Sequence, residues 1–393
     1  MKIQLFNGRI ITPFRIIDNG TVLIENGKIA DIQNGYKDYK DALKIDVQNN
    51  YISPGFIDMH THGGGGYDFM DGTVEAFLGA ARTHALHGTT SMVPTALTSS
   101  NDELFQMFSI YRQAKKENTN GAQFLGLHLE GPYFSMNQKG AQDPRYIRTP
   151  KREEYEEILK HTTDIIRWSA APELDGAMEF GRFLSQKGIL ASIAHSDAIY
   201  EEVVEAIENG YSHITHLYSA MSGVMRKNAY RYAGIIESAF LLDQLTVEII
   251  ADGIHLPASL LQLIYRQKGP GRIALITDSM RAAGLPSGES ILGSLKDGLK
   301  VIVEDGVAKL PDRSAFAGSV ATTDRLVRNM VHLAGVPLLH AVQMITSTPA
   351  QICGVYKDKG SLTIGKDADI IVFNDQIQIK TNIVNGHIIV NSL

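Results

Sequence analysis

The sequence predicts an α/β protein in which a (β/α)8, TIM-like barrel carries a second, small β-sandwich domain built from both chain termini. Apolar, strand-like runs alternate with amphipathic helical stretches through the middle of the chain, whereas β-type runs occupy both ends. A chain of 393 residues, of which 44% are hydrophobic, can bury a barrel core and a smaller companion domain. We therefore assign residues 53–357 to the barrel, and residues 1–52 plus 358–393 to the small domain.

The two ends of the chain share a hairpin pattern. Residues 20–25 and 28–32 are β-type runs joined by Asn26-Gly27, a dipeptide typical of tight hairpin turns. Near the other end, residues 369–373 and 377–390 are β-type, and the second run is interrupted by Asn385-Gly386. Because an isolated hairpin is only marginally stable, we expect the two ends to form one small domain together.

The middle of the chain contains as many strand-like runs as a (β/α)8 barrel requires. They are residues 56–62, 89–95, 124–130, 165–170, 189–195, 213–217, 247–251 and 273–278. The helix expected at residues 73–87 shows how the units are joined, because it buries an apolar face and ends at His87-Gly88 before the second strand. Residues 287–311 have two further β-like runs, which we interpret as a hairpin inserted after the eighth strand.

Composition narrows the class of partner. The net charge of −6 provides no broad basic surface for nucleic acid or an anionic membrane, so we expect a small-molecule substrate. The single cysteine, Cys353, cannot form an intramolecular disulfide, which favours a reducing compartment. With neither a signal-peptide pattern nor a long apolar segment in the sequence, we expect a cytoplasmic protein.

Potential metal ligands stand at the ends of five predicted strands. In a barrel, the C-terminal ends of the strands surround one mouth, so residues far apart in sequence can meet there. Imidazoles and carboxylates are ligands for zinc and related divalent ions, and alternation along a strand places both histidines of a His-X-His pair on one side. The residues concerned are His60, His62, Glu130, His195, His216 and Asp278.

Each of these residues also has a simpler interpretation. A His-X-His pair is common without a metal, a lone histidine is often a buried packing residue, and Asp278 could cap a helix. Joint placement at five strand ends favours the metal site, because packing alone does not predict it. The Gly63 to Gly66 run lacks the Lys-Ser/Thr of a nucleotide-binding loop, so we interpret it as a flexible loop beside the site.

Several motifs resemble those of the amidohydrolase superfamily and, within it, the N-acetylglucosamine-6-phosphate deacetylases. They are Ser53-Pro54-Gly55-Phe56-Ile57-Asp58-Met59-His60-Thr61-His62-Gly63, His128-Leu129-Glu130-Gly131-Pro132, Thr215-His216-Leu217, Ala251-Asp252-Gly253-Ile254-His255, Thr277-Asp278-Ser279 and Phe316-Ala317-Gly318-Ser319. The resemblance implies hydrolysis of the acetamide of an N-acetylated amino-sugar 6-phosphate. Many superfamily members carry a carboxylated lysine on strand four, but residues 165–170 contain none, which argues against a hydantoinase or dihydroorotase.

The resemblance also implies a set of roles. Glu130, His195 and His216 would hold a first divalent ion, and His60 and His62 would hold a second, with Glu130 as the bridge. Some deacetylases of this group lack the His-X-His pair and use one ion, so the intact pair favours two. Zinc is the expected ion, with iron or manganese as alternatives. Asp278 would act as general base and then general acid.

Substrate contacts follow from the same resemblance. They are Gln142, Ser219, Ala220, His255 and Ser319, together with a phosphate-binding cation from among Arg226, Lys227 and Arg231. Some members of the family have histidine where Gln142 stands. The family commonly has an intact Arg-Glu-Pro-Gly motif, often acting across a dimer interface, where this chain has a longer basic loop. We therefore expect a homodimer, although the cations could instead form a solvated loop face.

The altered loop leaves other functions open. One is deacetylation of N-acetylgalactosamine 6-phosphate, and another is hydrolysis of a different N-acyl substrate or cyclic amide. A catalytically silent assembly protein on the same barrel is a further alternative, but such proteins have usually lost metal ligands that this chain retains.

Overall fold

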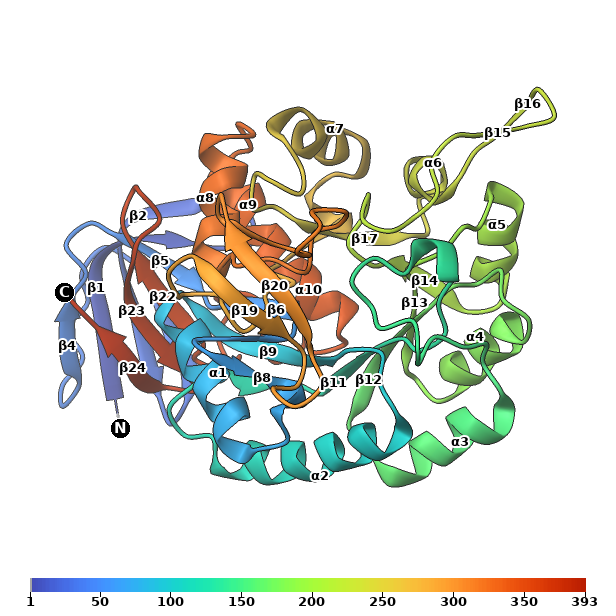
Figure 1. Ribbon diagram of the computed structural model, residues 1–393. Coiled ribbons are helices and arrows are strands. Elements are labelled where there is room, and N and C mark those ends of the chain that lie inside the picture. Colours follow the sequence, from blue (N-terminus) through green and yellow to red (C-terminus); the bar gives the residue numbers. More distant parts are fainter. Residues whose placement is uncertain (1) are drawn as a thin grey trace.

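The computed structural model describes residues 2–393 and confirms the predicted fold class (Figure 1). Neighbouring barrel strands run parallel to one another. The strands are β6 (Phe56–Thr61), β9 (Thr89–Ala96), β11 (Leu127–Glu130), β12 (Ile165–Ala170), β13 (Leu190–Ile193), β14 (Tyr211–Ile214), β17 (Thr246–Ile250) and β18 (Ile273–Ile276), with β10 (Gln123–Phe124) also paired to β9.

The first and last barrel strands are joined by hydrogen bonds at their C-terminal ends. The Asp278 N–H donates to the His60 carbonyl over 2.9 Å, and the His62 N–H donates to the Ser279 carbonyl over 2.8 Å. Below them, the buried Asp58 carboxylate on β6 accepts the Thr277 N–H and hydroxyl. These bonds close the barrel at the mouth, where the candidate ligands lie.

Helices surround the barrel, and their ends carry the expected signals. Thr73 caps the first helix by accepting the Ala76 N–H, and Gly88 follows with a φ of 94°, a left-handed conformation that favours glycine. The helices are α1 (Val74–Leu86), α2 (Asn101–Glu117), α3 (Arg152–His161), α4 (Ala177–Gln186), α5 (Tyr200–Glu208), α6 (Ile235–Leu241), α7 (Ala258–Lys268), α8 (Thr323–His332), α9 (Leu338–Ile345) and α10 (Ser347–Ile352). Within residues 2–393, no helix is long and apolar enough to cross a membrane.

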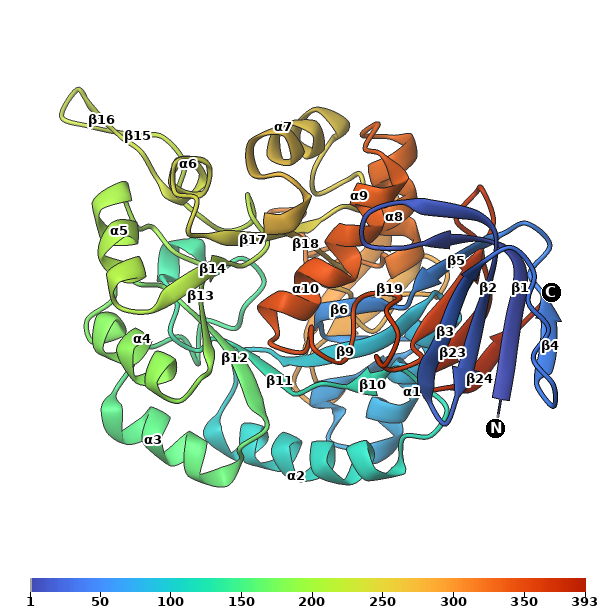
Figure 2. The same ribbon diagram turned by 180° about the vertical axis from the view of Figure 1, so that it is seen from behind.

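Both termini contribute to one separate, mixed sheet (Figure 2). The turn residues Asn26, Gly27, Asn385 and Gly386 all have positive φ, as their hairpins require. The sheet runs in the order β24 (His387–Asn391), β23 (Ile379–Val384), β22 (Ile370–Phe373), β5 (Tyr51–Pro54), β1 (Lys2–Ile11), β2 (Ile16–Glu25) and β3 (Lys28–Asn34), with β4 (Leu43–Asp46) paired to β1. Buried isoleucine and valine side chains form a core of its own.

The insertion after the eighth strand lies within the predicted residues 287–311 but has one strand more than predicted. It forms a three-stranded antiparallel sheet of β19 (Gly288–Leu292), β20 (Leu299–Glu304) and β21 (Val307–Lys309), so the expectation of a two-stranded hairpin was wrong. The third run is only three residues long, and strand patterning in so short a segment is easily missed. Its sheet packs Leu292, Val301 and Val303 against Met280, beside the barrel mouth.

The loop after β14 forms a separate hairpin that the sequence did not predict. Its strands, β15 (Met225–Lys227) and β16 (Tyr230–Tyr232), project away from the barrel at the upper right of Figure 1. The remaining short elements are β7 (Gly63–Gly64), β8 (Tyr67–Asp68), η1 (Phe69–Asp71), η2 (Met136–Gln138) and η3 (Pro270–Arg272).

Candidate metal centre

The barrel brings the six predicted metal and catalytic residues to one mouth. His60 lies on β6 with His62 just beyond it, and Glu130 is the last residue of β11. His195, His216 and Asp278 each lie two residues beyond the end of their strand. The fifth, sixth and eighth strands were therefore predicted too long. The chain leaves each strand and bends into a loop before it reaches His195, His216 or Asp278.

The three residues beyond the strands have left-handed backbones. The φ values are 46° for His195, 26° for His216 and 46° for Asp278. Such conformations are unfavourable for residues other than glycine and are held by surrounding contacts. The His195 carbonyl accepts the Ser135 N–H over 2.9 Å, and the Asp278 carbonyl accepts the Ser319 N–H over 2.7 Å. These bonds turn the functional side chains toward the cavity.

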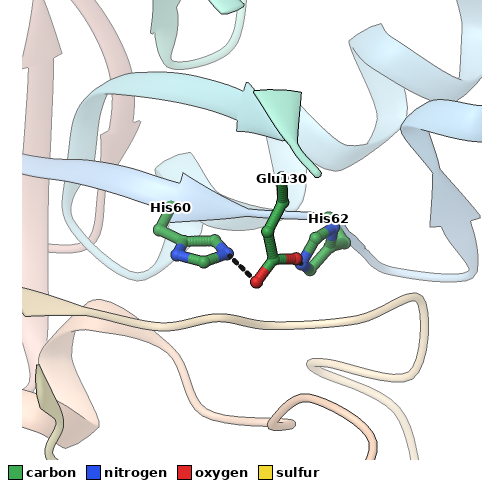
Figure 3. A group of neighbouring side chains, drawn as sticks. All are labelled: His60, His62 and Glu130. Atoms are coloured by element: carbon green, nitrogen blue, oxygen red, sulfur yellow. Dashed lines mark ion pairs between the residues drawn. The ribbon is translucent and has the colours of Figure 1, made fainter. Parts of the chain in front are cut away.

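Glu130 is the meeting point of the four histidines. Its Oε1 lies 3.0 Å from His216 Nε2 and 3.3 Å from His195 Nε2, while its Oε2 lies 3.2 Å from His62 Nε2. His60 Nε2 is 3.6 Å from Oε1, and Figure 3 shows the Glu130 carboxylate between the rings of His60 and His62. Glu130 therefore belongs to two candidate ligand groups, one with His60 and His62 and the other with His195 and His216.

A divalent ion fits these residues. His60 Nε2 is buried and has no hydrogen-bond partner within residues 2–393, although it points toward Glu130 and Asp278. A buried polar atom without a partner is costly, so its place beside two carboxylates indicates a ligand position. Imidazole nitrogens with carboxylate oxygens are a donor set for zinc, iron or manganese.

The ionisable side chains of the centre shift one another's pKa values. Burial disfavours the charged form of His60, but the carboxylates of Glu248, Glu130 and Asp278 outweigh it and raise the pKa of His60 to about 9. Burial would raise the pKa of the Asp278 carboxyl, yet His60 and His62 lower it below its ordinary value. Since a metal requires neutral imidazoles, ion binding would release protons from this cluster.

Glu248 on β17 orients His60 from the barrel interior. Its Oε1 accepts a hydrogen bond from His60 Nδ1 over 2.7 Å, which leaves the Nε2 lone pair free to face the site. The buried Arg167 guanidinium pairs with the other oxygen of Glu248, and His213 Nε2 lies 3.4 Å from that oxygen. Sequence reasoning missed Glu248, although a carboxylate in an otherwise apolar barrel strand was an available signal.

A loop after β11 orients His195. His195 Nδ1 donates to the Gln138 carbonyl over 2.7 Å, so its Nε2 faces Glu130. The loop is held in turn by Asp197, which accepts hydrogen bonds from the side chains of Ser135, Asn137 and Gln138. In the neutral form of each ring, the hydrogen bonds at Nδ1 of His60 and His195 place the lone pair on Nε2, beside Glu130.

An open cavity of about 560 Å³ lies over the centre. Of the predicted substrate contacts, it is lined by Gln142, Ser219, Ala220 and His255. His255 Nδ1 donates to the Asp252 carboxylate over 2.8 Å, and its ring packs against Phe316, another lining residue. Ser319 is buried beneath the wall, where its hydroxyl donates to the Thr277 carbonyl, whereas the neighbouring Gly318 lines the cavity.

The three predicted phosphate-binding cations lie elsewhere. Arg226, Lys227 and Arg231 are exposed on the β15–β16 hairpin, and none of them lines the cavity of their own chain. Lys139 does line it, and within residues 2–393 it is the one lysine or arginine to do so. Sequence reasoning did not select Lys139, because nothing in its local pattern distinguishes it from a solvated loop lysine.

Comparison with known proteins agrees with this geometry. The amidohydrolase family matches residues 51–389. The chain is 33% identical to the N-acetylglucosamine-6-phosphate deacetylase of Bacillus subtilis, over 96% of this chain and 95% of that protein. It is 30% identical to the N-acetylgalactosamine-6-phosphate deacetylase of Escherichia coli O157:H7, over 97% of each.

Solved structures of N-acetylglucosamine-6-phosphate deacetylases have the same fold as this chain. A mutant N-acetyl-D-glucosamine-6-phosphate deacetylase from Mycobacterium smegmatis, in complex with N-acetyl-D-glucosamine-6-phosphate, matches with a TM-score of 0.91 at 28% identity. The match covers 99% of this chain and 100% of that one. The enzyme from Pasteurella multocida matches with a TM-score of 0.91 at 29% identity, over 99% of each chain. The chain is a hydrolase of amide bonds that belongs to the amidohydrolase family and, within it, to the N-acetylglucosamine-6-phosphate deacetylases.

Proposed function

We propose that this protein hydrolyses the acetamide of N-acetylglucosamine 6-phosphate to glucosamine 6-phosphate and acetate. The observation that carries the proposal is the convergence of four histidines, Glu130 and Asp278 beneath an open cavity, in a chain whose relatives bear that activity in their names. A cavity of about 560 Å³ is of the size that small-molecule ligands occupy.

We assign the metal ligands as two groups that share Glu130. His195 and His216 would complete the first, and His60 and His62 the second. A divalent ion held by these residues would supply a water molecule of lowered pKa and would polarise the acetyl carbonyl. We expect zinc, with iron or manganese as alternatives, and two ions per subunit because the His-X-His pair is intact.

Asp278 is the residue that we assign to proton transfer. Its carboxylate lies at the cavity floor, with Oδ1 3.1 Å from His62 Nε2, and its lowered pKa keeps it deprotonated near neutral pH. It can accept a proton from the attacking water. As the carbon–nitrogen bond breaks, the same proton passes from Asp278 to the sugar nitrogen, which leaves as the amine. Asp278 is thereby returned to its starting state.

Binding of the sugar would involve several lining residues. We assign Ser219, Ala220 and His255 to this role, with Gln142 at the edge of the metal centre. Ser319 would contribute indirectly, because its backbone N–H donates to the Asp278 carbonyl and helps to fix the loop that carries Asp278. We expect a cationic side chain to bind the phosphate, because hydrogen bonds between charged groups are stronger than those between neutral groups.

We propose a homodimer on the basis of the β15–β16 hairpin. Its cations, Arg226, Lys227 and Arg231, do not line their own cavity, and the hairpin carries exposed Tyr230 on a projecting ribbon. A second copy of the chain would allow one of these cations to reach the phosphate in the partner's cavity. We place the protein in the cytoplasm, in keeping with its single cysteine and small-molecule substrate.

A second candidate substrate is N-acetylgalactosamine 6-phosphate. It is favoured by the likeness to the E. coli deacetylase of that name and by the absence of an intact Arg-Glu-Pro-Gly motif. Acetate release from both phosphorylated sugars and both unphosphorylated sugars separates the candidates. We expect the highest kcat/KM with N-acetylglucosamine 6-phosphate, and a value at least about tenfold lower without phosphate. Equal rates on the unphosphorylated sugars would remove the phosphate from the proposal.

A further inference from the structure

Gln142 contacts the metal centre directly. Its Nε2 donates a hydrogen bond to Glu130 Oε2 over 2.8 Å, and the side chain is buried. Within residues 2–393, Gln142 is the one residue other than histidine whose side chain donates to the Glu130 carboxylate. Besides lining the cavity, where the sequence predicts a substrate contact, Gln142 therefore also contacts a candidate metal ligand.

The orientation of the Gln142 amide is fixed by its two partners. Its Oε1 accepts the Thr98 N–H over 3.0 Å, and a backbone N–H can only donate. Its Nε2 must then face Glu130, where a carboxylate can only accept. Gln142 thus connects the β9 loop to the carboxylate through two bonds that agree with each other.

The two oxygens of Glu130 have different neighbours. Oε1 lies within 3.3 Å of the Nε2 atoms of His195 and His216 and 3.6 Å from that of His60, whereas Oε2 lies 3.2 Å from His62 Nε2. A partial rotation of the carboxylate about its terminal bond would move Oε2 away from His62, and such torsions have broad preferences. The hydrogen bond from Gln142 to Oε2 opposes that rotation.

We propose that Gln142 is a positioning residue for the two-ion centre. By holding Glu130 Oε2 beside His62, it increases the affinity for the ion on the His60–His62 side. This inference rests on the metal-dependent function proposed above. An ion held by His195 and His216 would lie beside Oε1, the oxygen nearest those two rings, and would therefore depend less on the contact between Gln142 and Oε2. Removal of the Gln142 amide donor should therefore weaken binding of the ion on the His60–His62 side more than binding of the ion at His195 and His216.

The test is a zinc titration of metal-stripped protein against a competing chelator, without substrate. Gln142→Met keeps the length of the side chain but removes the donor. We expect the dissociation constant of the ion on the His60–His62 side to rise about tenfold or more, in the range usual for residues that orient ligands. In a His62→Gln background, which leaves the other ion, Gln142→Met should change the constant less than about twofold.

Two variants control for the substitution itself. Gln113→Met makes the same change at an exposed position on α2, where the Gln113 amide donates a hydrogen bond to Glu117, and should leave both constants unaltered. Gln142→His restores a ring N–H donor and should recover part of the lost affinity. If Gln142→Met does not fold, Gln142→Asn carries the test, because the shorter amide cannot reach both Thr98 and Glu130.

An equal loss at both ions, no change at either, or a single ion in the unaltered protein would overturn the proposal. Because no substrate is present, these constants stand apart from the turnover assay. Altered metal binding with normal substrate preference, or the converse, distinguishes failure of this inference from failure of the proposed reaction.

Discussion

His60 donates a hydrogen bond from Nδ1 to Glu248 Oε1 over 2.7 Å, and both side chains are completely buried. The same oxygen accepts the backbone N–H of His216 over 3.2 Å. One carboxylate therefore contacts both candidate ligand groups, through a side chain in one and through the backbone in the other. Arg167 supplies the compensating charge that allows Glu248 to remain ionised in the barrel interior.

Loss of Glu248 should weaken metal binding without direct loss of a ligand. Because Glu248→Gln alone leaves Arg167 unpaired, the double variant Arg167→Met, Glu248→Gln keeps the charge balanced. We expect zinc affinity to fall about 10–100-fold while the protein stays folded, as measured by chelator competition and circular dichroism. Unchanged affinity in a folded double variant would show that His60 does not need this partner.

Asp278→Asn should separate proton transfer from metal binding. The amide keeps the size of the side chain but cannot accept and return a proton, so we expect kcat to fall about 10²–10⁴-fold. Metal content, measured by elemental analysis of the same sample, should stay within about one-fifth of the unaltered value. Rapid turnover by Asp278→Asn would assign the proton transfer to another group.

The hairpin cations should matter only for phosphorylated substrate. Replacing Arg226, Lys227 and Arg231 together by glutamine removes each candidate, and a charged hydrogen bond contributes about 1.5–3 kcal/mol. We expect kcat/KM for the phosphorylated sugar to fall about tenfold or more, with no change for the unphosphorylated sugar. Arg112→Gln, on the exposed face of α2, is the control. A uniform loss on both sugars would instead indicate damage to the fold.

His84 should contribute to acid sensitivity. It is buried on α1, donates from Nε2 to the Gly63 carbonyl, and burial lowers its pKa to about 4. The unfolded chain binds the proton first, near pH 6.5, so stability present above that pH is lost as pH falls toward 4. Between pH 7 and 5, metal-free protein should lose about 2 kcal/mol more than His84→Gln in urea unfolding.

The matched control for that measurement is His387→Gln, which removes an exposed imidazole from β24, so that an effect confined to His84→Gln is assigned to the buried ring. If the free energy of unfolding of His84→Gln had the same dependence on pH as that of the unaltered protein, burial of a neutral His84 would not be the cause of the acid sensitivity.

Sequence patterns predicted the barrel well because buried parallel strands leave long apolar runs that end in functional residues. β12 was predicted at its observed bounds, Ile165–Ala170. The fifth and sixth strands were extended through His195 and His216, since a left-handed bend at a single residue leaves no mark on hydrophobic periodicity. Asn-Gly turns were recognised because their chemistry is local.

Contacts between distant segments could not be read from local patterns. Glu248 is joined to His60 across the barrel, and Gln142 reaches Glu130 from a loop. The carboxylate of Glu248 in an apolar strand is a local signal, but the partner of neither residue follows from its own neighbourhood. The projection of Arg226 and Arg231 away from their cavity depends on the course of a hairpin that the surrounding sequence did not specify.

The most direct test of the account is turnover of N-acetylglucosamine 6-phosphate during removal and return of metal. Acetate release and metal content should fall together as the protein is dialysed against a chelator, and both should recover when about two equivalents of zinc per chain are added. Undiminished acetate release from protein that carries no metal would contradict the central claim that these histidines, Glu130 and Asp278 act through bound ions.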